Sequence, residues 1–464
     1  MKRRRIVWIA RRITALCLCL VLTGCSGGGA DYALGTTEYG FGPQGGEAEV
    51  SYEVPAARPN VLTDCFGYEP GSEKTVIFHG KELPDTFTLR DAKTREVVYT
   101  GKVKKKSTDG DTLGEFDSYG EFSDFRKPGD YYIQVDRYGE SYPFIIHDNL
   151  YYSLYLRAFE KLHGMRSTET GGGGWQMQET GAEKEISACL SICQLLFSYE
   201  MFPEVYTDDT DISESGNGIP DVLDECRYEV EWLIDQAAQE EETDGIVCGY
   251  RAATLAKYAY LTKSFDTAFA GECLKAAETA WKNANKDLSV SDGLIAFAAA
   301  ELYRVTGGRQ YLGLAEEYLG NSVAKEEKLS DPEFFGGVTY MNTKSKVDVE
   351  LCDAIIRKIM EEAEEIAEVS KQNSLLVYGE TERVDRREIL QQMMRICIVN
   401  HVITNHEYNI VIENHFHYLM GRNPDSVCHV SYWEGQEMQT DDIMKNPVEN
   451  TAFLFMMSEL LSNG

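Results

Sequence analysis

One change of hydrophobic periodicity, near residue 149, constrains the fold of this 464-residue chain more than any other feature. Before it, short segments rich in Val, Ile, Tyr and Phe alternate with turns such as Lys127–Asp130, a pattern that predicts β-strands. After it, apolar residues recur at helical spacing, as at Val222, Cys226, Val230 and Leu233. We therefore expect a β-domain over residues 47–147 and an all-α domain over residues 148–464.

Regular short strands over about a hundred residues are typical of an immunoglobulin-like β-sandwich. In the all-α part, about ten to twelve helices without an intervening strand are compatible with a toroid of paired helices or with a solenoid. No fixed sequence repeat of the solenoid kind is visible, which favours the toroid. The polar stretch 325–348 interrupts the helical pattern, and we expect a surface excursion or part of a cleft rim there.

The N-terminus has the pattern of a bacterial lipoprotein signal. Residues 1–12 are rich in Lys and Arg, and Ile13–Leu22 is too short for a bilayer span of roughly 20 residues but suits a signal-peptide core. The segment Leu22–Cys25, LTGC, resembles a lipobox, whose cysteine is lipidated and becomes the new N-terminus. The alternative is an uncleaved membrane anchor. We favour a signal peptide over residues 1–24 and a flexible tether over residues 25–46.

Charge excludes two classes of partner. The formal net charge is −31, whereas nucleic acids and anionic lipid surfaces bind proteins through Lys and Arg. We therefore expect no nucleic-acid partner, and membrane contact only through the lipid on Cys25. That lipid would hold the protein outside the cytoplasm, anchored to the bacterial cell membrane.

The sequence predicts no metal site and no cofactor. Of twelve cysteines, nine follow residue 25, and they form no CxxC pair, so most are expected to be small buried hydrophobic side chains. His415 and His417 are two residues apart on a predicted helix and cannot share a face. The loop with Asp208, Asp209 and Asp211 has oxygen ligands of the kind that calcium prefers, but we expect a solvated loop.

Several segments resemble glycoside hydrolase family 9. In the helical part these are ESGNGIPDVLDECRYEVEWLI (214–234), AAAELYRVTGGRQYLGLAEEY (298–318) and HYLMGRNPDSV (417–427). In the β-part, NVLTDCFGYEPGSEKTVIF (60–78) is similar to the cellulase-type immunoglobulin-like domain that precedes some family members. The resemblance implies a β-sandwich followed by an (α/α)6 toroid of six helical hairpins. Its inner helix ends would form an open groove for β-glucan chains.

The family resemblance also indicates where the catalytic groups belong. An inverting glycosidase needs a carboxylic acid and a carboxylate base roughly 6.5–9.5 Å apart. Family members carry the base in a GGW-x-DAGD segment, and Gly173–Trp175 matches its beginning. The two aspartates are replaced by Met177 and Thr180, and the family's acid, a glutamate near the C-terminus, aligns with Pro447.

Two neighbouring carboxyl groups are the candidate replacements. Glu179 follows the Gly173–Trp175 segment, and Glu449 lies two residues beyond the position of the family's acid. The alternatives are that Glu179 is a solvated loop acid and that Glu449 only favours the positive end of a helix.

Three further residues are candidates for contact with sugar. Trp175 is expected either to stack on a sugar ring or to pack its loop onto the helices. His429 and Trp433 are candidates for lining the groove, whereas Arg422 and Asn423 are expected to brace a turn.

Two functions therefore remain. One is a surface lipoprotein that hydrolyses O-glycosidic bonds of a β-glucan or related oligosaccharide in polysaccharide degradation. The other is a catalytically inactive carbohydrate-binding or assembly lipoprotein that retained the fold, since fold alone does not imply function. If Glu179 and Glu449 face one groove, hydrolysis gains support. If they lie apart in solvent, the hypothesis of hydrolysis fails.

Overall fold

The computed structural model describes residues 59–80, 83–105, 118–167, 173–239, 244–379, 381, 383–431 and 442–462. These residues fall in one compact unit that begins at Pro59. The signal segment, Cys25, the tether and Trp433 lie outside the described residues.

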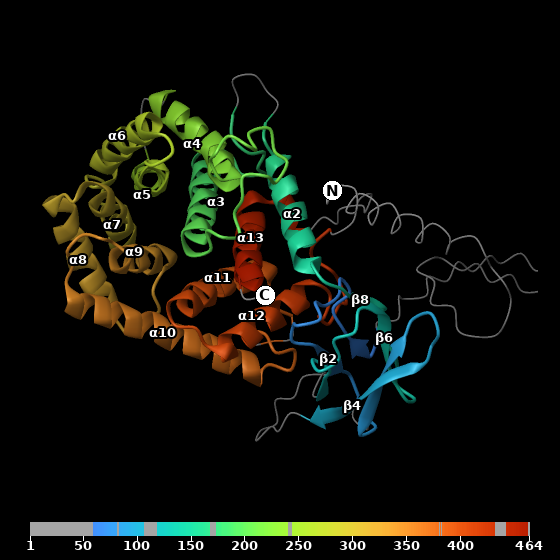
Figure 1. The fold of residues 1–464 in the computed structure, drawn as a ribbon. Helices are drawn as coiled ribbons and strands as arrows, with labels where there is room; N and C mark the ends of the chain where they lie inside the picture. The colour runs from blue at the N-terminus through green and yellow to red at the C-terminus, as the bar shows by residue number, and fades with distance from the viewer. Residues whose placement is uncertain are drawn as a thin grey trace, which may run out of the picture. The chain divides into compact units, whose positions relative to one another are not determined.

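The first part is an antiparallel β-fold, as predicted for an immunoglobulin-like domain (Figure 1). Its strands are β1 (Val61–Leu62), β2 (Thr75–Phe78), β3 (Thr86–Asp91), β4 (Val97–Lys105), β5 (Ser118–Glu121), β6 (Gly129–Val135), β7 (Gly139–Glu140) and β8 (Phe144–Ile146). They pair in the order β1-β2-β5-β4-β3-β6-β7, with β8 also on β6. The long strand β4 pairs with β3 in its first half and with β5 in its second, and so links the two sheets.

The core of the β-fold gathers around the fully buried ring of Phe87. A Cβ atom placed on Gly101 or on Gly120 would lie 2.2 or 2.3 Å from that ring. Both positions therefore need glycine, because the aromatic ring occupies the space of a side chain on two neighbouring strands.

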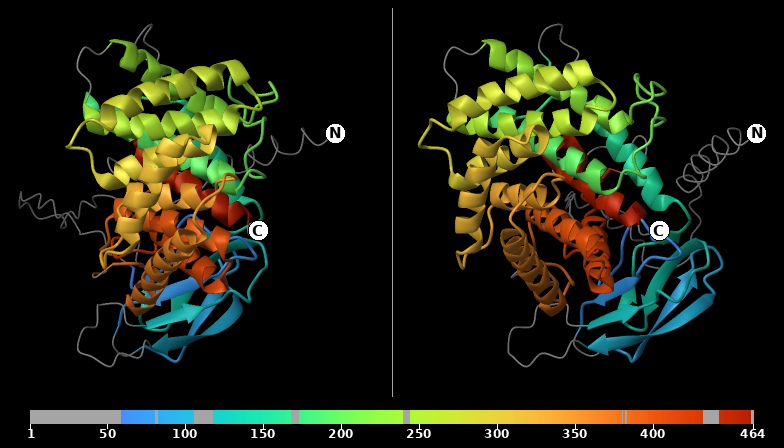
Figure 2. Two further views of the ribbon diagram at one scale, coloured as in Figure 1. Left: turned by 90° about the vertical axis from the view of Figure 1, so that its left-hand side faces the viewer. Right: turned by 60° about the vertical axis from the view of Figure 1, so that its left-hand side comes forward.

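The second part is all-α, as predicted. Its described helices are α2 (Leu150–His163), α3 (Ala182–Met201), α4 (Asp221–Gln239), α5 (Gly245–Thr262), α6 (Thr267–Ala284), α7 (Asp292–Thr306), α8 (Arg309–Val323), α9 (Asp331–Met341), α10 (Val349–Gln372), α11 (Arg386–Val402), α12 (His406–Leu419) and α13 (Pro447–Ser462), with a short 3-10 helix η1 (Ile443–Lys445) before the last. The odd-numbered helices form an inner ring and the even-numbered helices lie outside it (Figures 1 and 2). This is the (α/α)6 toroid that the family resemblance implied.

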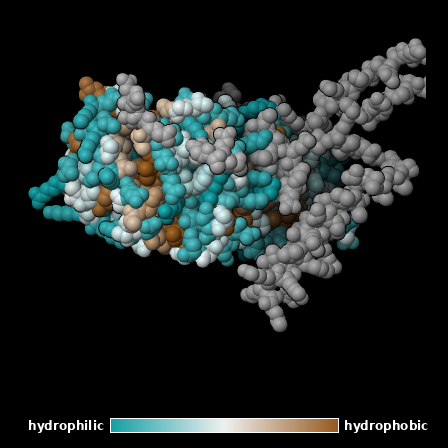
Figure 3. All heavy atoms as spheres, turned by 90° about the horizontal axis from the view of Figure 1, so that it is seen from above, coloured by the Kyte–Doolittle hydropathy of each residue, from teal (hydrophilic) through white to brown (hydrophobic). Residues whose placement is uncertain are grey.

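The alternation of inner and outer helices determines where a site can form. Each outer helix returns the chain, so the inner helices run parallel and their N-terminal ends meet at one end of the ring. Helix α13 is buried on almost every side, which explains why its sequence, PVENTAFLFMMSELLS, has little amphipathic pattern. On the outside, the face seen in Figure 3 is mostly hydrophilic, in keeping with the acidic composition.

One element was missed by the sequence analysis. The polar stretch 325–348 contains helix α9, which begins where Glu333 accepts a hydrogen bond from the backbone N–H of Ser330 at 2.8 Å. Gly336 obscured the helical pattern, yet its lack of a side chain lets α9 approach α7, because a Cβ there would lie 3.0 Å from Cα of Phe297. The expectation of a cleft rim holds for Asp331, which lines a pocket described below.

The helical ring has a seam between α9 and α11. The described residues of these two inner helices make little direct contact, and α10 spans the seam. The buried guanidinium of Arg395 on α11 closes it. Its Nη2 donates to Asp331 Oδ1 of α9 at 2.7 Å, and its Nη1 donates to Glu362 Oε2 of α10 at 2.7 Å. One side chain therefore ties three helices together.

The β-fold and the helices meet at helix α12. The ring of His417 lies 2.8 Å from Asp64 Oδ2 through Nδ1 and 3.0 Å from the carbonyl oxygen of Glu73 through Nε2. In the following turn, Asn423 Nδ2 donates to the carbonyl oxygens of Tyr418 and Val427. Arg422 is fully buried and donates to the carbonyl oxygen of Asn414 at 2.9 Å. The prediction that Arg422 and Asn423 brace a turn is confirmed.

Among the described residues, no helix combines the length and hydropathy that crossing a membrane requires.

Replacing Arg395 with Met should lower the free energy of unfolding by about 3–5 kcal/mol, because the buried Glu362 then loses its cationic partner. Arg357→Met is the control, since Arg357 pairs with Asp353 on the exposed face of α10 and should contribute less than about 1 kcal/mol. Urea denaturation monitored by circular dichroism measures both. Equal losses in the two variants would contradict the account of the seam.

Candidate active site

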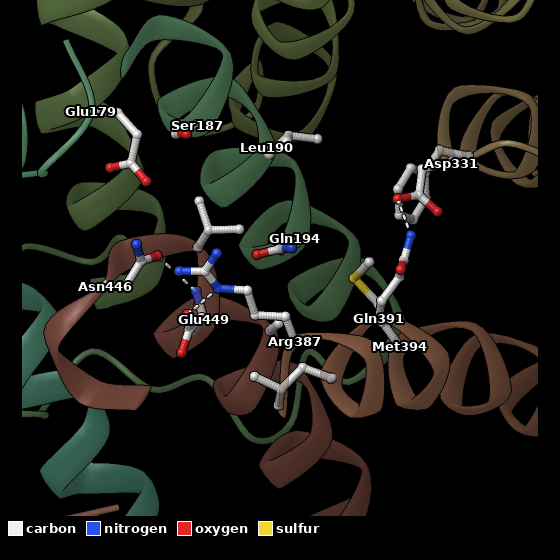
Figure 4. A pocket seen from close by; sticks show the side chains of 14 residues that line it. Glu179, Ser187, Leu190, Gln194, Asp331, Arg387, Gln391, Met394, Asn446 and Glu449 are labelled. Atoms are coloured by element: carbon white, nitrogen blue, oxygen red, sulfur yellow. Dashed lines mark hydrogen bonds and ion pairs between the residues drawn. The ribbon is translucent and has the colours of Figure 1, made fainter. Parts of the chain in front are cut away.

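A pocket of about 270 Å³ lies at the N-terminal ends of the inner helices α3, α9, α11 and α13 (Figure 4). Its walls are formed by Glu179, Ser187, Leu190, Gln194, Asp331, Phe335, Arg387, Leu390, Gln391, Met394, Asn446, Val448, Glu449 and Ala452. Both candidate carboxyl groups, Glu179 and Glu449, are among them. The fold thus brings the segment after Gly173–Trp175 and the start of α13 to one cavity.

Glu179 supplies an unsatisfied acceptor to the pocket. Its carboxylate points into the cavity (Figure 4), and its buried Oε2 has no hydrogen-bond partner among the described residues. A buried carboxylate oxygen without a donor is costly unless water or a ligand occupies it. This atom is therefore suited to accept a hydrogen bond from a water molecule or a hydroxyl group in the pocket.

Glu449, in contrast to Glu179, is bound by two arginines. It lies in the first turn of α13 with its side chain 4% exposed, and it accepts from Arg386 Nε and Arg387 Nε, each at 2.6 Å. The hydrogen bond and the charge of Glu449 raise the pKa of Arg387, with a further contribution from Glu179. Arg387 is 69% exposed and Arg386 only 22% exposed, so one of the two cationic partners is free to move into solvent.

Met177, Thr180 and Pro447 stand at the positions where the family has its catalytic carboxyl groups. Met177 packs against the hydrophobic core, and Thr180 is exposed. Pro447 is buried at the first position of α13, where its fixed φ suits the start of a helix. None of the three side chains carries a carboxyl group, so none can act as the acid or the base of an inverting pair.

The prediction that Trp175 stacks on a sugar is wrong, because the ring is fully buried. Its Nε1 donates to Glu225 Oε1 at 2.7 Å, and its backbone N–H donates to Glu229 Oε2 at 2.6 Å. The preceding Gly174 has φ +86°, and a Cβ there would lie 2.8 Å from the ring of Trp232. The alternative is confirmed: the glycines and Trp175 pack this loop onto helix α4.

Two buried glutamates of α4 hold the loop, and the sequence analysis assigned them no role. Glu225 also faces His163 Nδ1 at 2.8 Å and Arg166 at 2.9 Å. Burial raises the pKa of Glu229 to about 8. The available signal was their spacing of four residues, which places both carboxyl groups on one face of the helix.

The other described residues that were considered for a site, His429 and Asp208, lie outside the pocket lining. His429 does not line the pocket, so its predicted place in the groove is not supported; its backbone pairs with Leu419 and Ile443. Asp208 is engaged within its own loop, where it accepts from the backbone N–H groups of Gly216 and Gly218, each at 2.7 Å. In the part of the chain that the structure describes, no group of three or more His, Cys, Asp or Glu is arranged to hold a metal.

The buried Glu229 predicts a pH dependence of stability. Because its folded pKa of about 8 lies above its unfolded value near 4.5, its contribution is full below pH 4.5 and is lost as the pH rises toward 8. In Glu229→Gln, the decline in unfolding free energy over this range should be shallower by about 1.4 kcal/mol per pH unit. Urea denaturation at several pH values measures the difference, and parallel curves for the two proteins would refute it.

Comparison with known proteins agrees with this architecture. Residues 238–447 match the family model of glycosyl hydrolase family 9, and residues 56–140 match that of the cellulase N-terminal ig-like domain. Endoglucanase D of Acetivibrio thermocellus is 20% identical over 421 residues, which cover 70% of this chain and 66% of that protein. Endoglucanase C of Cellulomonas fimi is 29% identical over 192 residues, 29% of this chain and 17% of that protein. The chain thus spans only a small part of some curated relatives.

Solved structures show the same fold. A metagenome-derived glycoside hydrolase family 9 endoglucanase has a TM-score of 0.70 at 19% identity, over 86% of this chain and 98% of that one. AaCel9A in complex with cellobiose-like isofagomine has a TM-score of 0.71 at 15% identity, over 87% and 100%. The chain therefore has the fold of these proteins, an immunoglobulin-like domain joined to a helical toroid. The match to the model of glycosyl hydrolase family 9 covers residues 238–447 of this chain.

Proposed function

We propose that this chain hydrolyses O-glycosidic bonds of a β-glucan or related oligosaccharide in the pocket that Glu179 and Glu449 share. One observation carries the proposal: two carboxyl groups from distant segments line one cavity at the N-terminal ends of the inner helices. The relatives support the substrate class, because they are endoglucanases and one solved relative holds a cellobiose-like compound.

The surroundings of the two groups suggest their roles. Glu179 has a buried oxygen without a hydrogen-bond partner among the residues that the structure describes, and it is suited to take a proton from the attacking water. The water oxygen bonds to the anomeric carbon as the bond to the leaving oxygen breaks, and Glu449 gives its proton to that oxygen. For this step Glu449 must first take up a proton, which requires the exposed Arg387 to release it.

A second candidate function is binding of the same glycans without cleavage. The salt bridges from Arg386 and Arg387 favour it, because they occupy both oxygens of Glu449 and leave neither free to face a leaving oxygen. Gln194, Gln391 and Asn446 would then supply amide groups that hydrogen-bond sugar hydroxyls.

Hydrolysis is tested by reducing-end release from mixed β-glucans with the purified protein. Glu179→Gln and Glu449→Gln should each lower the rate about 10²–10⁴-fold while glycan binding persists, since each removes a proton-transfer group and keeps the side-chain shape. Glu183→Gln is the matched control: this exposed acid is near Glu179 in sequence, lies outside the pocket lining and should leave the rate unchanged.

The outcomes separate the two functions. Glycan binding by the unaltered protein without any release would refute hydrolysis and support the binding function. Release that survives in both glutamine variants would refute the assigned pair.

We also propose that the protein is a lipoprotein outside the cytoplasm, held to the bacterial cell membrane through Cys25. The support is the sequence Leu22–Cys25 after a short apolar core. In the native host, Cys25→Ala should abolish incorporation of labelled fatty acid and shift the protein from the membrane fraction. An unlabelled protein that stays in the membrane fraction, with or without the substitution, would instead indicate the uncleaved anchor.

A further inference from the structure

The pocket that Glu179 and Glu449 line has a group of hydrogen-bond donors at the start of α13. Arg386 and Arg387 approach from the first turn of α11, and Asn446 immediately precedes α13. We call these three residues the donor corner. Its two guanidinium groups are paired with one carboxylate, that of Glu449. Two positive charges against one negative charge leave this corner with one positive charge in excess.

Arg387 is the member of the donor corner that a ligand can reach. Its side chain is 69% exposed and lines the pocket. Glu449 uses only its Nε, which donates to Oε1 at 2.6 Å, whereas Nη1 and Nη2 make no hydrogen bond to the residues that the structure describes. The guanidinium lies in the cavity between Glu449 and Glu179 in the view of Figure 4. Two adjacent N–H donors on a planar cation match the two oxygens of a carboxylate.

The charge of Arg387 persists in the pocket. Glu449, by its hydrogen bond and its charge, and to a smaller extent Glu179 raise the pKa of Arg387. The guanidinium therefore remains cationic at every pH at which the protein is studied.

Asn446 adds a neutral donor beside this cation. Its Oδ1 accepts from the backbone N–H of Glu449 at 3.2 Å, which identifies Nδ2 as the other end of the amide. Asn446 is half-buried and lines the pocket, so Nδ2 is available to a ligand (Figure 4). The N-terminal end of α13, which begins at the next residue, adds partial positive charge at the same place.

The opposite wall of the pocket offers an acceptor. The buried Oε2 of Glu179 has no hydrogen-bond partner among the described residues. Asp331, the third acid of the lining, already accepts from Arg395 and Gln391. A ligand that fits both walls carries hydroxyl groups to donate to Glu179 and an acid group to accept from the donor corner. A sugar acid has both.

The acidic composition of the chain does not exclude such a ligand. A formal net charge of −31 repels polyanions, which need many cationic contacts. A single carboxylate needs one local site, and at physiological ionic strength charges beyond about 8 Å are largely screened.

We propose that this pocket selects a β-linked oligosaccharide that carries a uronic acid unit, whose carboxylate binds Nη1 and Nη2 of Arg387 and Nδ2 of Asn446. The inference rests on the proposed glycan ligand and narrows it to an acidic class, whether the glycan is cleaved or only bound. Because Nε of Arg387 keeps its contact with Glu449, no ion pair has to break when the carboxylate binds. Arg387 is thereby assigned as the residue that determines specificity.

Isothermal titration calorimetry of the full chain at neutral pH tests the proposal with three matched disaccharides. They are cellobiose, the same sugar with one C6 hydroxymethyl group oxidised to a carboxylate, and the methyl ester of that uronate, each with sulfur as the glycosidic atom so that it is not cleaved. The uronate should bind about tenfold more tightly than cellobiose and the ester, equivalent to about 1.4 kcal/mol. The ester separates the effect of charge from that of shape.

Variants assign the preference to one side chain. Arg387→Gln should abolish the preference for the uronate and leave binding of cellobiose unchanged. Arg387→Lys keeps the charge without the planar fork and should retain a preference of about threefold. Arg357→Gln is the matched control: Arg357 is 66% exposed and paired with Asp353 on α10, and its loss should leave the full preference.

The results distinguish this proposal from the proposed function. Equal affinity for the three sugars, or weaker binding of the uronate, would overturn the acidic class and leave the pocket as a glycan site. A preference that survives in Arg387→Gln would overturn the assignment of that residue. Failure of the unaltered protein to bind any of the three would overturn both the acidic class and the glycan site. A preference lost in Arg387→Gln and kept in Arg357→Gln, with unaltered thermal unfolding of both, supports the proposal.

Discussion

The guanidinium group of Arg395 maintains the helical ring at the seam where the described inner helices touch least. By holding Asp331 and Glu362 it joins α9 and α10 to α11, and it fixes Asp331 in the wall of the pocket that Glu179 and Glu449 line. A buried ion network of this kind is costly to desolvate and costlier to break, so it specifies one arrangement of three helices. The shape of the pocket at the N-terminal ends of the inner helices therefore depends on Arg395.

Across the helical ring, a second buried network, made of hydrogen bonds, positions the loop that carries Glu179. Glu225 and Glu229 of α4 hold Trp175 by its indole and its backbone, and close packing around Gly174 leaves no room for a side chain. The loop therefore enters the pocket at a defined point, although its aromatic ring faces the core. Glu449 approaches from α13, held by two arginines of α11. In the proposed hydrolysis, proton transfer by Glu449 would depend on those two arginines as much as on the carboxyl group itself.

The fold was largely predictable from the sequence, because periodicity and turn signals are local, and the family segments extended this to the toroid. Helix α9 was missed where glycines needed for close packing imitate a loop. The site was less predictable, because its contacts are not local. Trp175 meets acids 50 and 54 residues away, and Arg386 meets Glu449 across 63 residues. Sequence identified the carboxyl groups that share the pocket but not the partners that control them.

The stereochemistry of the product tests the central claim most directly. If Glu179 activates water while Glu449 protonates the leaving oxygen, hydrolysis inverts the anomeric carbon. Proton NMR of a fresh digest of a β-linked glucan oligosaccharide should then show the α-anomer first, before mutarotation. The β-anomer as first product, or no product at protein concentrations that bind the glycan, would contradict the account.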